Sequence, residues 1–319
     1  MKKGFWFAIG YGLLLTAFTA YVLMDSFTIS RVYTPVPPPP TFQAATLPNL
    51  PTEPNDPASP SMPTNPDAPS DPVTYPIITE NSYIDEYINI TLTEYREYDT
   101  SIYVADIRVS DVRFLKAAFD KDQYGKNIKE KTSDMAKNKN AILAINGDYY
   151  GSRDVGYVLR NGLLYRDKGA NDREDLIIWP DGRFGIAYER NTSAKSLLDE
   201  GAWQVFSFGP ALVKNSRISV DVDTEVGQAT YSNPRTAIAM VDKLHYLMVV
   251  SDGRTDRSEG LTLYQLAEFL QSKGATLAYN LDGGGSSTMY FNGQVVNEPV
   301  NHGSTVSERS ISDIVYIGY

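Results

Sequence analysis

The residues best suited to chemistry lie in one short segment near the C-terminus, residues 279–293, which reads YNLDGGGSSTMYFNG. An acid, three glycines and two serines stand between two stretches with the composition of strands, although a hairpin needs only two turn residues. Consecutive glycines let the backbone approach a ligand and aim successive N–H groups at one point, which forms an anion-binding nest. Asp282 ends the first stretch and has the chemistry to hold a sugar hydroxyl, bind a cation or act as acid or base. We therefore predict an anion-binding loop at Gly283, Gly284, Gly285, Ser286 and Ser287.

The glycine run does not match the common nucleotide-binding loops. The mononucleotide loop requires G-x-x-x-x-G-K-[ST], but no lysine follows these glycines, and the dinucleotide pattern G-x-G-x-x-G is not matched either. A nucleophilic Ser286 would need a neighbouring base, and neither His245 nor His302 stands in a recognisable spacing to it. The pattern therefore favours neither a nucleotide site nor a Ser-His pair.

Three further segments have the same form, because in each an apolar stretch ends at charged or amide side chains beside glycine or proline. They are Asn146-Gly147-Asp148, Asn233-Pro234-Arg235 and Asp252-Gly253-Arg254. A turn explains each one alone, since these residue types dominate turns. Together they provide carboxylates, and their arginines are forked donors suited to phosphate or carboxylate.

Another polar cluster lies close to the C-terminus. Arg309 adds a forked donor and Glu308 adds a carboxylic acid, although a solvated strand edge explains this pair equally well. His302 lies in a loop rich in Gly, Ser and Asn, and it is the histidine that we consider for the site. His245 lies in a strand pattern and is predicted to be structural.

The elements that must position these side chains are mostly strands. Alternating segments rich in Ile, Val, Tyr and Thr run through residues 83–110, and Asn161-Gly162, Pro180-Asp181-Gly182 and Asp242-Lys243 are predicted to close hairpins. Leu263, Leu266, Ala267 and Leu270 recur at helical spacing, with Thr262 as the cap and Gly274 at the end of the helix. A short helix or turn is predicted near residues 128–137. The pattern indicates an α+β fold with a mixed, strand-dominated sheet and a few flanking helices.

The N-terminus predicts one membrane-spanning helix in front of this fold. Lys2 and Lys3 precede 21 residues without a charge, residues 4–24, and this length spans the hydrocarbon core. The lysines place residues 1–3 in the cytoplasm and the C-terminal domain outside it, so we expect a single-pass protein of the cell membrane. A cleavable signal peptide is the alternative, but Phe18 and Ala20 do not form a good small-x-small cleavage site.

Residues 25–79 are predicted to be a disordered stalk, because 15 of the 19 prolines lie between Pro35 and Pro76. The alternative for this stretch is a ligand for a proline-binding domain. The remaining residues, 80–319, have the size of one domain.

Composition excludes several classes of function. The net charge is −10 and there is no basic run, so nucleic acid is not expected as a partner. The absence of cysteine excludes disulfides, thiol nucleophiles and cysteine-ligated metals. No cofactor is required by the sequence. Calcium or magnesium near Asp282 stays open, because carboxylate and carbonyl oxygens suit these ions, although no ligand spacing demands one.

Five segments, in order, resemble the phosphodiester glycosidase family: AINGDYYG, FGPALV, NPRTAIAM, the stretch from VSDGR to MYFNG, and the closing ERSISDIVYIGY. The resemblance covers about residues 141–319 and implies hydrolysis of a sugar–phosphate diester at the anomeric carbon, which releases the sugar and leaves a phosphomonoester. It implies that Asn146, Arg235, Asp252, Asp282, Gly283, Gly284, Ser286 and Arg309 line a cavity, and it leaves Asp148 and Glu308 as further candidates.

Three hypotheses follow from these observations. The first is an anchored, extracytoplasmic hydrolase of phosphate-linked surface glycans or exopolysaccharide, whose catalytic carboxylates come from Asp282, Asp252, Glu308 and Asp148. The second is a non-catalytic module on the same fold that binds glycan phosphates or assembles polymer. The third is a purely structural protein, in which the four strand ends would be scattered in space.

Overall fold

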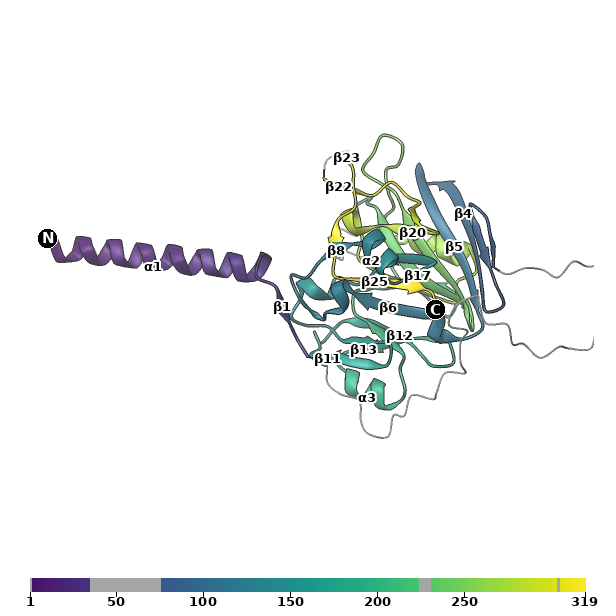
Figure 1. Ribbon diagram of the computed structural model, residues 1–319, viewed down its shortest axis with the longest axis horizontal. Coiled ribbons are helices and arrows are strands. Elements are labelled where there is room, and N and C mark those ends of the chain that lie inside the picture. The colour runs from purple at the N-terminus through teal and green to yellow at the C-terminus, as the bar shows by residue number, and fades with distance from the viewer. Residues whose placement is uncertain (1, 35–75, 224–230, 303–304) are drawn as a thin grey trace, which may run out of the picture.

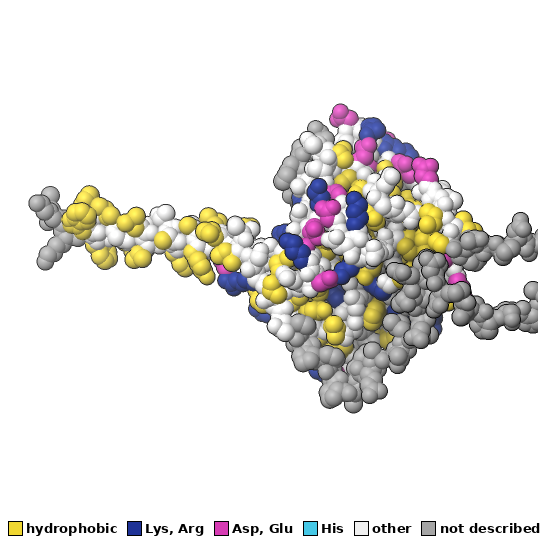
Figure 2. Space-filling view, in the orientation of Figure 1, with side chains coloured by type: hydrophobic (Ala, Val, Ile, Leu, Met, Phe, Trp, Pro, Cys, Tyr) yellow, Lys and Arg dark blue, Asp and Glu magenta, His cyan; other side chains and the backbone are white. Residues whose placement is uncertain are grey.

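The structure, a computed structural model, describes residues 2–34, 76–223, 231–302 and 305–319. The N-terminal helix α1 (Lys2–Phe27) projects from a strand-rich domain (Figure 1). Its segment Phe5–Phe27 has a mean hydropathy of 1.8 and is long and apolar enough to cross a membrane. Figure 2 shows hydrophobic side chains along this helix, and none of them is covered by the domain.

The two described ends of the predicted stalk pair with the domain, while residues 35–75 lie outside the described residues. The strand β1 (Arg31–Val32) pairs with β7 (Gly125–Lys126), and β2 (Ile77–Ile78) pairs with β3 (Ser82–Ile84). The chain therefore returns to the domain directly after α1, which ends three residues beyond the predicted anchor at residue 24.

Every strand ladder among the described residues is antiparallel. The first sheet has nine strands, in the order β16 (Arg217–Ile218), β15 (Ala211–Lys214), β19 (Leu277–Asn280), β17 (Arg235–Asp242), β18 (His245–Ser251), β5 (Thr100–Val109), β4 (Ile88–Glu97), β3 and β2. The second has five strands, in the order β21 (Gln294–Val295), β20 (Met289–Phe291), β9 (Leu143–Asn146), β25 (Asp313–Ile317) and β6 (Leu115–Phe119). The third also has five, in the order β11 (Leu163–Arg166), β10 (Val158–Arg160), β14 (Gln204–Phe206), β12 (Glu174–Ile178) and β13 (Phe184–Tyr188).

Short elements complete the described fold. Two small ladders join β24 (Ser310–Ile311) to β8 (Glu130–Lys131) and β22 (Val300–His302) to β23 (Thr305–Val306). The remaining α-helices are α2 (Thr132–Asn138), α3 (Ala194–Asp199) and α4 (Leu263–Ser272). Four 3-10 turns are η1 (Val112–Phe114), η2 (Asp120–Asp122), η3 (Tyr150–Ser152) and η4 (Gly284–Ser286).

The core lies between the nine-stranded sheet and the five-stranded sheet that contains β9. Ile107 and Met248 from the first sheet and Ile145 from the second belong to this cluster. Phe269 of α4 packs on the opposite face of the nine-stranded sheet, and Ala136 of α2 packs on the outer face of the other. Alternate side chains of β9 therefore enter different layers, as expected for a strand buried on both faces.

The predicted α+β class, with strands dominating and few flanking helices, is confirmed. The hairpins at Asn161-Gly162, Asp181-Gly182 and Asp242-Lys243 all form, and α4 begins with a capping box at Thr262. The strands β18 and β19, which α4 connects, are not adjacent, because β17 lies between them and is antiparallel to both.

Candidate active site

One cavity collects several of the strand ends singled out in the sequence. Its volume is about 500 Å³, and its lining includes Asn146, Gly147, Asp282, Ser286, Arg309 and Asp313. This volume lies within the range of small-molecule sites. The hypothesis that these segments are scattered in space therefore fails for the ends of β9 and β19.

Two sheets bring these residues together. Asn146, the last residue of β9, stands opposite Ile314 of β25, so Asn146 and Asp313 come from adjacent strands. The Asn146 side chain also links the two sheets, because its Nδ2 donates to the Asp282 carbonyl oxygen at 2.6 Å and its Oδ1 accepts from Thr236 Oγ1 at 2.8 Å. Asn146 thus fixes the backbone that carries Asp282.

The glycine run makes room for two arginines. A Cβ atom added at Gly284 would lie 2.9 Å from Arg254 Nη2, and a Cβ atom added at Gly285 would lie 2.6 Å from Arg309 Nη2. The charges of Arg254 and Arg309 affect each other: burial lowers the pKa of Arg254, and the nearby Arg309 lowers it further. Because the two positive charges repel each other at this separation, an anion bound between them would be favourable.

The predicted anion nest is wrong for three of the loop amides. Gly284 N donates to the Pro234 carbonyl at 2.8 Å, Ser286 N to Gly283 at 3.2 Å, and Ser287 N to Gly284 at 3.1 Å. These groups are used inside the protein because the loop folds into η4. The positive charge beside the loop comes from arginine side chains.

Asp282 and Arg309 provide opposite charges in the same cavity. Burial raises the pKa of Asp282, and the hydrogen bond with Ser286 and the charge of Arg309 oppose this shift. Arg309 is held by Asn301, whose Oδ1 accepts from Nε at 2.8 Å, and its Nη1 lies 3.5 Å from Ser286 Oγ. The cavity therefore pairs an acid that can exchange a proton with a cation that can hold a phosphate.

Arg235 and Asp252 lie behind the loop and are not among the described residues that line the cavity. Arg235 Nε donates to the Leu261 carbonyl at 2.8 Å. Asp252 accepts from Glu298 N at 2.8 Å and from Asn297 Nδ2 at 3.2 Å, and burial raises its pKa. Both side chains stabilise the loops around the site.

Asp148 belongs to a buried ion cluster beneath the cavity. Arg160 Nη2 lies 2.8 Å from Asp148 Oδ2 and 3.1 Å from Asp313 Oδ2, and all three side chains are buried. Burial alone would raise the pKa of Asp148, but Arg160 and Arg153 outweigh it and the pKa is lowered. Burial and the Asp148 charge raise the pKa of Asp313 to about 7.

Glu308 points to a helix terminus. Its carboxylate accepts from Ser133 Oγ at 2.6 Å and from Ser133 N at 3.0 Å, at the start of α2. This contact uses the unpaired amide of a helix N-terminus, where a carboxylate is favourable. Arg309, the next residue, lines the cavity while Glu308 does not.

Two other predicted site residues, His302 and Ser287, are not among the described residues that line the cavity. His302 ends β22 and pairs through its backbone with Thr305, but its side chain lies outside the described atoms. Ser287 is buried, and its carbonyl accepts from Asn297 Nδ2 at 3.1 Å.

The sequence interpretation missed several residues that line the cavity, among them Phe27, Lys129, Tyr149 and Asp313. Asp313 could have been found, because it stands at the start of the last strand within the segment that carries the family resemblance. Phe27 and Lys129 carry no local signal, since they reach the cavity through the pairing of β1 with β7.

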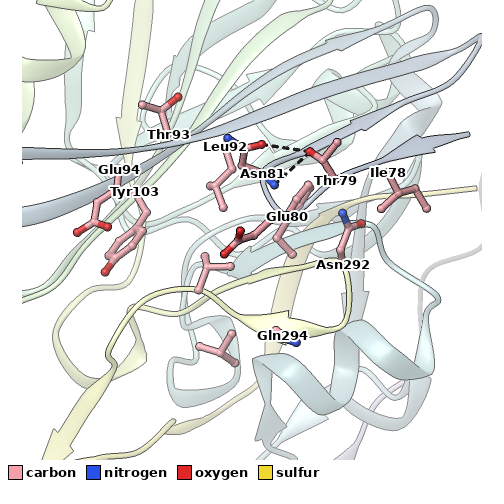
Figure 3. A pocket seen from close by; sticks show the side chains of 13 residues that line it. Ile78, Thr79, Glu80, Asn81, Leu92, Thr93, Glu94, Tyr103, Asn292 and Gln294 are labelled. Atoms are coloured by element: carbon pink, nitrogen blue, oxygen red, sulfur yellow. Dashed lines mark hydrogen bonds between the residues drawn. The ribbon is translucent and has the colours of Figure 1, made fainter.

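A second cavity has a volume of about 880 Å³ and is lined by none of the predicted site residues (Figure 3). Its lining includes Glu80, Glu94, Tyr103, Asn292 and Gln294. Among the described residues, no group of three or more His, Asp or Glu side chains is arranged to hold a metal ion. The acid and cation pair of the smaller cavity is therefore the better candidate for an active site.

Comparison with known proteins identifies the family of the chain. The sequence model of the phosphodiester glycosidase family matches residues 139–318. The chain is 31% identical over 201 residues to the SPbeta prophage-derived uncharacterized protein YomE of Bacillus subtilis (strain 168), covering 61% of this chain and 31% of that protein. It is 26% identical over 159 residues to the mouse N-acetylglucosamine-1-phosphodiester alpha-N-acetylglucosaminidase, covering 46% of this chain and 31% of that protein. The chain thus spans about a third of the length of these relatives.

The fold also matches a solved structure, the zebrafish N-acetylglucosamine-1-phosphodiester alpha-N-acetylglucosaminidase catalytic domain auto-inhibited by pro-peptide. The TM-score is 0.59 with 22% sequence identity, and the match covers 73% of this chain and 83% of that one.

Proposed function

The chain belongs to the phosphodiester glycosidase family, and from this premise we propose that it is a membrane-anchored hydrolase of sugar-1-phosphodiesters on surface glycans or exopolysaccharide. The observation that carries the proposal is the meeting of Asp282 and Arg309 in one cavity beside the glycine loop. Two curated relatives of known activity act on N-acetylglucosamine-1-phosphodiesters, which supports a substrate of this chemical class.

The reaction adds water to the anomeric carbon and breaks the bond between that carbon and the phosphate oxygen. Arg309, with Ser286 beside it, holds the phosphate and stabilises the charge that develops on it. Asp282 acts at the sugar, as the nucleophile or as the base that activates water. A phosphomonoester leaves readily, so a second carboxylic acid in hydrogen-bonding reach of the leaving oxygen is less necessary than in ordinary glycosidases.

The helix α1 supports anchoring. Its apolar segment Phe5–Phe27 is uncovered and has the length of a membrane span, and Lys2 and Lys3 favour a cytoplasmic N-terminus. The domain would then face the outside, where glycans of the cell surface are found. We assign residues 1–3 to the cytoplasm and residues 80–319 to the hydrolase domain.

The test uses the full-length chain in detergent with N-acetylglucosamine-1-phospho-methylmannoside. We expect release of free sugar and phosphomonoester, and Asp282→Asn should lower kcat/KM by about a hundred- to ten-thousand-fold with the fold preserved. Asp172→Asn is the matched control, because its side chain is 89% exposed and lies in no part of the site. Unchanged turnover in Asp282→Asn would contradict the assignment, and binding of several sugar phosphodiesters without release would favour the non-catalytic module.

A further inference from the structure

We propose that the active-site cavity opens toward the membrane surface and takes a sugar-1-phosphodiester whose phosphate is carried by a membrane lipid. This inference rests on the proposed hydrolase function and on α1 as the anchor. It concerns where the site stands relative to the bilayer, and therefore which substrates can reach it.

The first observation is that the end of α1 is fixed to the domain. Asn127 Nδ2 donates to the carbonyl oxygens of Asp25 at 3.2 Å and Ile29 at 2.9 Å, and Ser30 Oγ donates to the Asn127 carbonyl at 3.1 Å. Asp25 forms an ion pair with Arg31 across the same turn. These contacts hold the last turn of the helix against one segment of the domain.

The strand that follows continues this attachment. β1 pairs with β7, Tyr33 N donates to the Tyr124 carbonyl at 2.8 Å, and the two tyrosine rings lie 5.9 Å apart. The fit is close, because a side chain on Gly125 would lie 2.0 Å from the Arg31 carbonyl oxygen. The helix and the domain are therefore joined by an ordered strand pairing, and the domain has a fixed orientation relative to α1.

The second observation is that this attachment stands at the cavity. Phe27, the last residue of α1, lines the cavity together with Lys129, which follows β7 and Asn127 in sequence. The segment Phe5–Phe27 has 23 residues, which at about 1.5 Å per residue gives about 34 Å, slightly more than the hydrocarbon core of about 30 Å. Phe27 and the side of the cavity that it lines thus lie at the level of the lipid headgroups.

The chemistry of the rim fits this location. Phe27 is 78% exposed and Tyr149 is 41% exposed, although both line the cavity. The Lys129 ammonium lies 5.8 Å from the centre of the Tyr149 ring. Exposed aromatic and basic side chains are typical of protein surfaces that contact the membrane interface. The remote end of a lipid-borne substrate would stay in the bilayer while its phosphate reaches Lys129 and Arg309.

The reaction on such a substrate is balanced without a further reactant. Water adds to the anomeric carbon, the bond from that carbon to the phosphate oxygen breaks, and the products are a free sugar and a lipid phosphomonoester that remains in the membrane. An enzyme anchored in the same bilayer as its substrate meets that substrate at a higher effective concentration than a substrate in solution.

The experiment uses the full chain in phosphatidylglycerol and phosphatidylethanolamine vesicles. Turnover is measured on hexadecyl N-acetylglucosamine-1-phosphate in the same vesicles and on its methyl counterpart in solution. We expect the wild-type chain to cleave the hexadecyl substrate at least about tenfold more efficiently. Two variants release the attachment of α1 to the domain. Asn127→Gly removes the side-chain amide that holds the helix end and keeps a residue suited to the local φ of 58°. Gly125→Ala adds a Cβ atom against the Arg31 carbonyl and so separates β1 from β7.

Both variants keep α1 as the tether but no longer hold the cavity toward the bilayer, so they should lower this preference and keep their turnover of the methyl substrate. The control is Gly10→Ala, because a side chain added there meets nothing within 4 Å. Equal efficiency on the two substrates in the wild type, or a preference unchanged in the variants, would overturn the inference. A rise in methyl turnover in the variants would also overturn it, since it would show that residues 27–33 block the cavity.

A second measurement tests the orientation independently of turnover. The chain has no cysteine, so single nitroxide labels can be placed at Lys129→Cys on the rim and at Thr93→Cys on β4, which lies away from α1 in Figure 1. Relaxation by a nickel-chelating lipid should be strong at position 129 and weak at position 93. Equal relaxation at both would refute the orientation. If neither substrate is cleaved while the labels show the expected difference, the proposed hydrolase function fails and the orientation stands.

Discussion

Substitution of Gly285 by alanine isolates the contribution of Arg309 without removing it. The added side chain would lie 2.6 Å from Arg309 Nη2 and 2.9 Å from the Asn301 Cα, so the guanidinium must move away from Ser286. A charge-assisted hydrogen bond to phosphate contributes about 1.5–3 kcal/mol. Its loss in the transition state corresponds to a fall in kcat/KM of about 10- to 150-fold.

The assay measures kcat/KM of Gly285→Ala for the methylmannoside diester, with Gly12→Ala in α1 as the control, where the space around the added side chain is open. Thermal unfolding of both variants shows whether the fold survives. Because the added side chain meets the Asn301 backbone as well as the Arg309 guanidinium, the unfolding temperature should fall by several degrees. An unchanged kcat/KM with an intact fold would refute the assignment of Arg309 as the phosphate-binding group.

Three further predictions concern buried or partly buried charges. Burial and the Glu189 charge raise the pKa of Asp175 to about 9, so the folded state binds a proton that the unfolded state releases, and stability should fall as the pH rises between about 4 and 9. The unfolding free energy of Asp175→Asn relative to the wild type should therefore increase between pH 5 and pH 8, by up to about 4 kcal/mol, as measured by thermal unfolding. The same difference between variant and wild type at both pH values would contradict this. Arg160→Met leaves Asp148 and Asp313 buried without their cation, so it should lower the free energy of unfolding by about 3–5 kcal/mol in urea. A decrease below about 1 kcal/mol would show that the cluster is not a stabilising ion network. Glu308→Gln should lower the free energy of unfolding by at most about 1 kcal/mol and change kcat/KM by no more than about twofold, because the Glu308 carboxylate contacts the start of α2. A hundredfold loss of activity would make Glu308 a catalytic candidate again.

The sequence predicts which strand ends carry chemistry better than it predicts what each side chain does there. Asn146 and Asp282 are both found at the cavity, since apolar strands that end in polar residues beside glycine are visible as a pattern. Arg309 is found there as well, but it is indicated by the family resemblance and not by a strand end. The separation of Asp148 from Asp313 is not visible in the same way. Both carboxylates contact the buried Arg160, but the pairing of β25 with β9 also places Asp313 in the lining of the cavity.

The glycine loop shows the same limit in another form. A run of glycines is compatible with a nest of free amides and equally with clearance for neighbouring side chains, because both require the absence of Cβ atoms. The distinction depends on contacts with Pro234, Arg254 and Arg309. These residues lie 24 to 50 positions away from the glycines along the chain, and the fold brings them to the loop. Local sequence therefore identifies the position of the loop, and only the tertiary structure identifies its role.

The distribution of charge connects the fold to the proposed chemistry. The chain carries a net charge of −10, yet two cations, Lys129 and Arg309, line the cavity, and Arg254 lies close to Arg309. The two acids of the lining, Asp282 and Asp313, both have raised pKa values, so their negative charge opposes an incoming phosphate less than two ordinary carboxylates would. An acidic surface repels anionic ligands in general, whereas this cavity attracts one locally. At an ionic strength of about 0.1 M, salt screens the repulsion at distances beyond about 10 Å. Turnover of a soluble phosphodiester should therefore depend on ionic strength more strongly than turnover of the proposed lipid-borne substrate, which would not have to cross that acidic field.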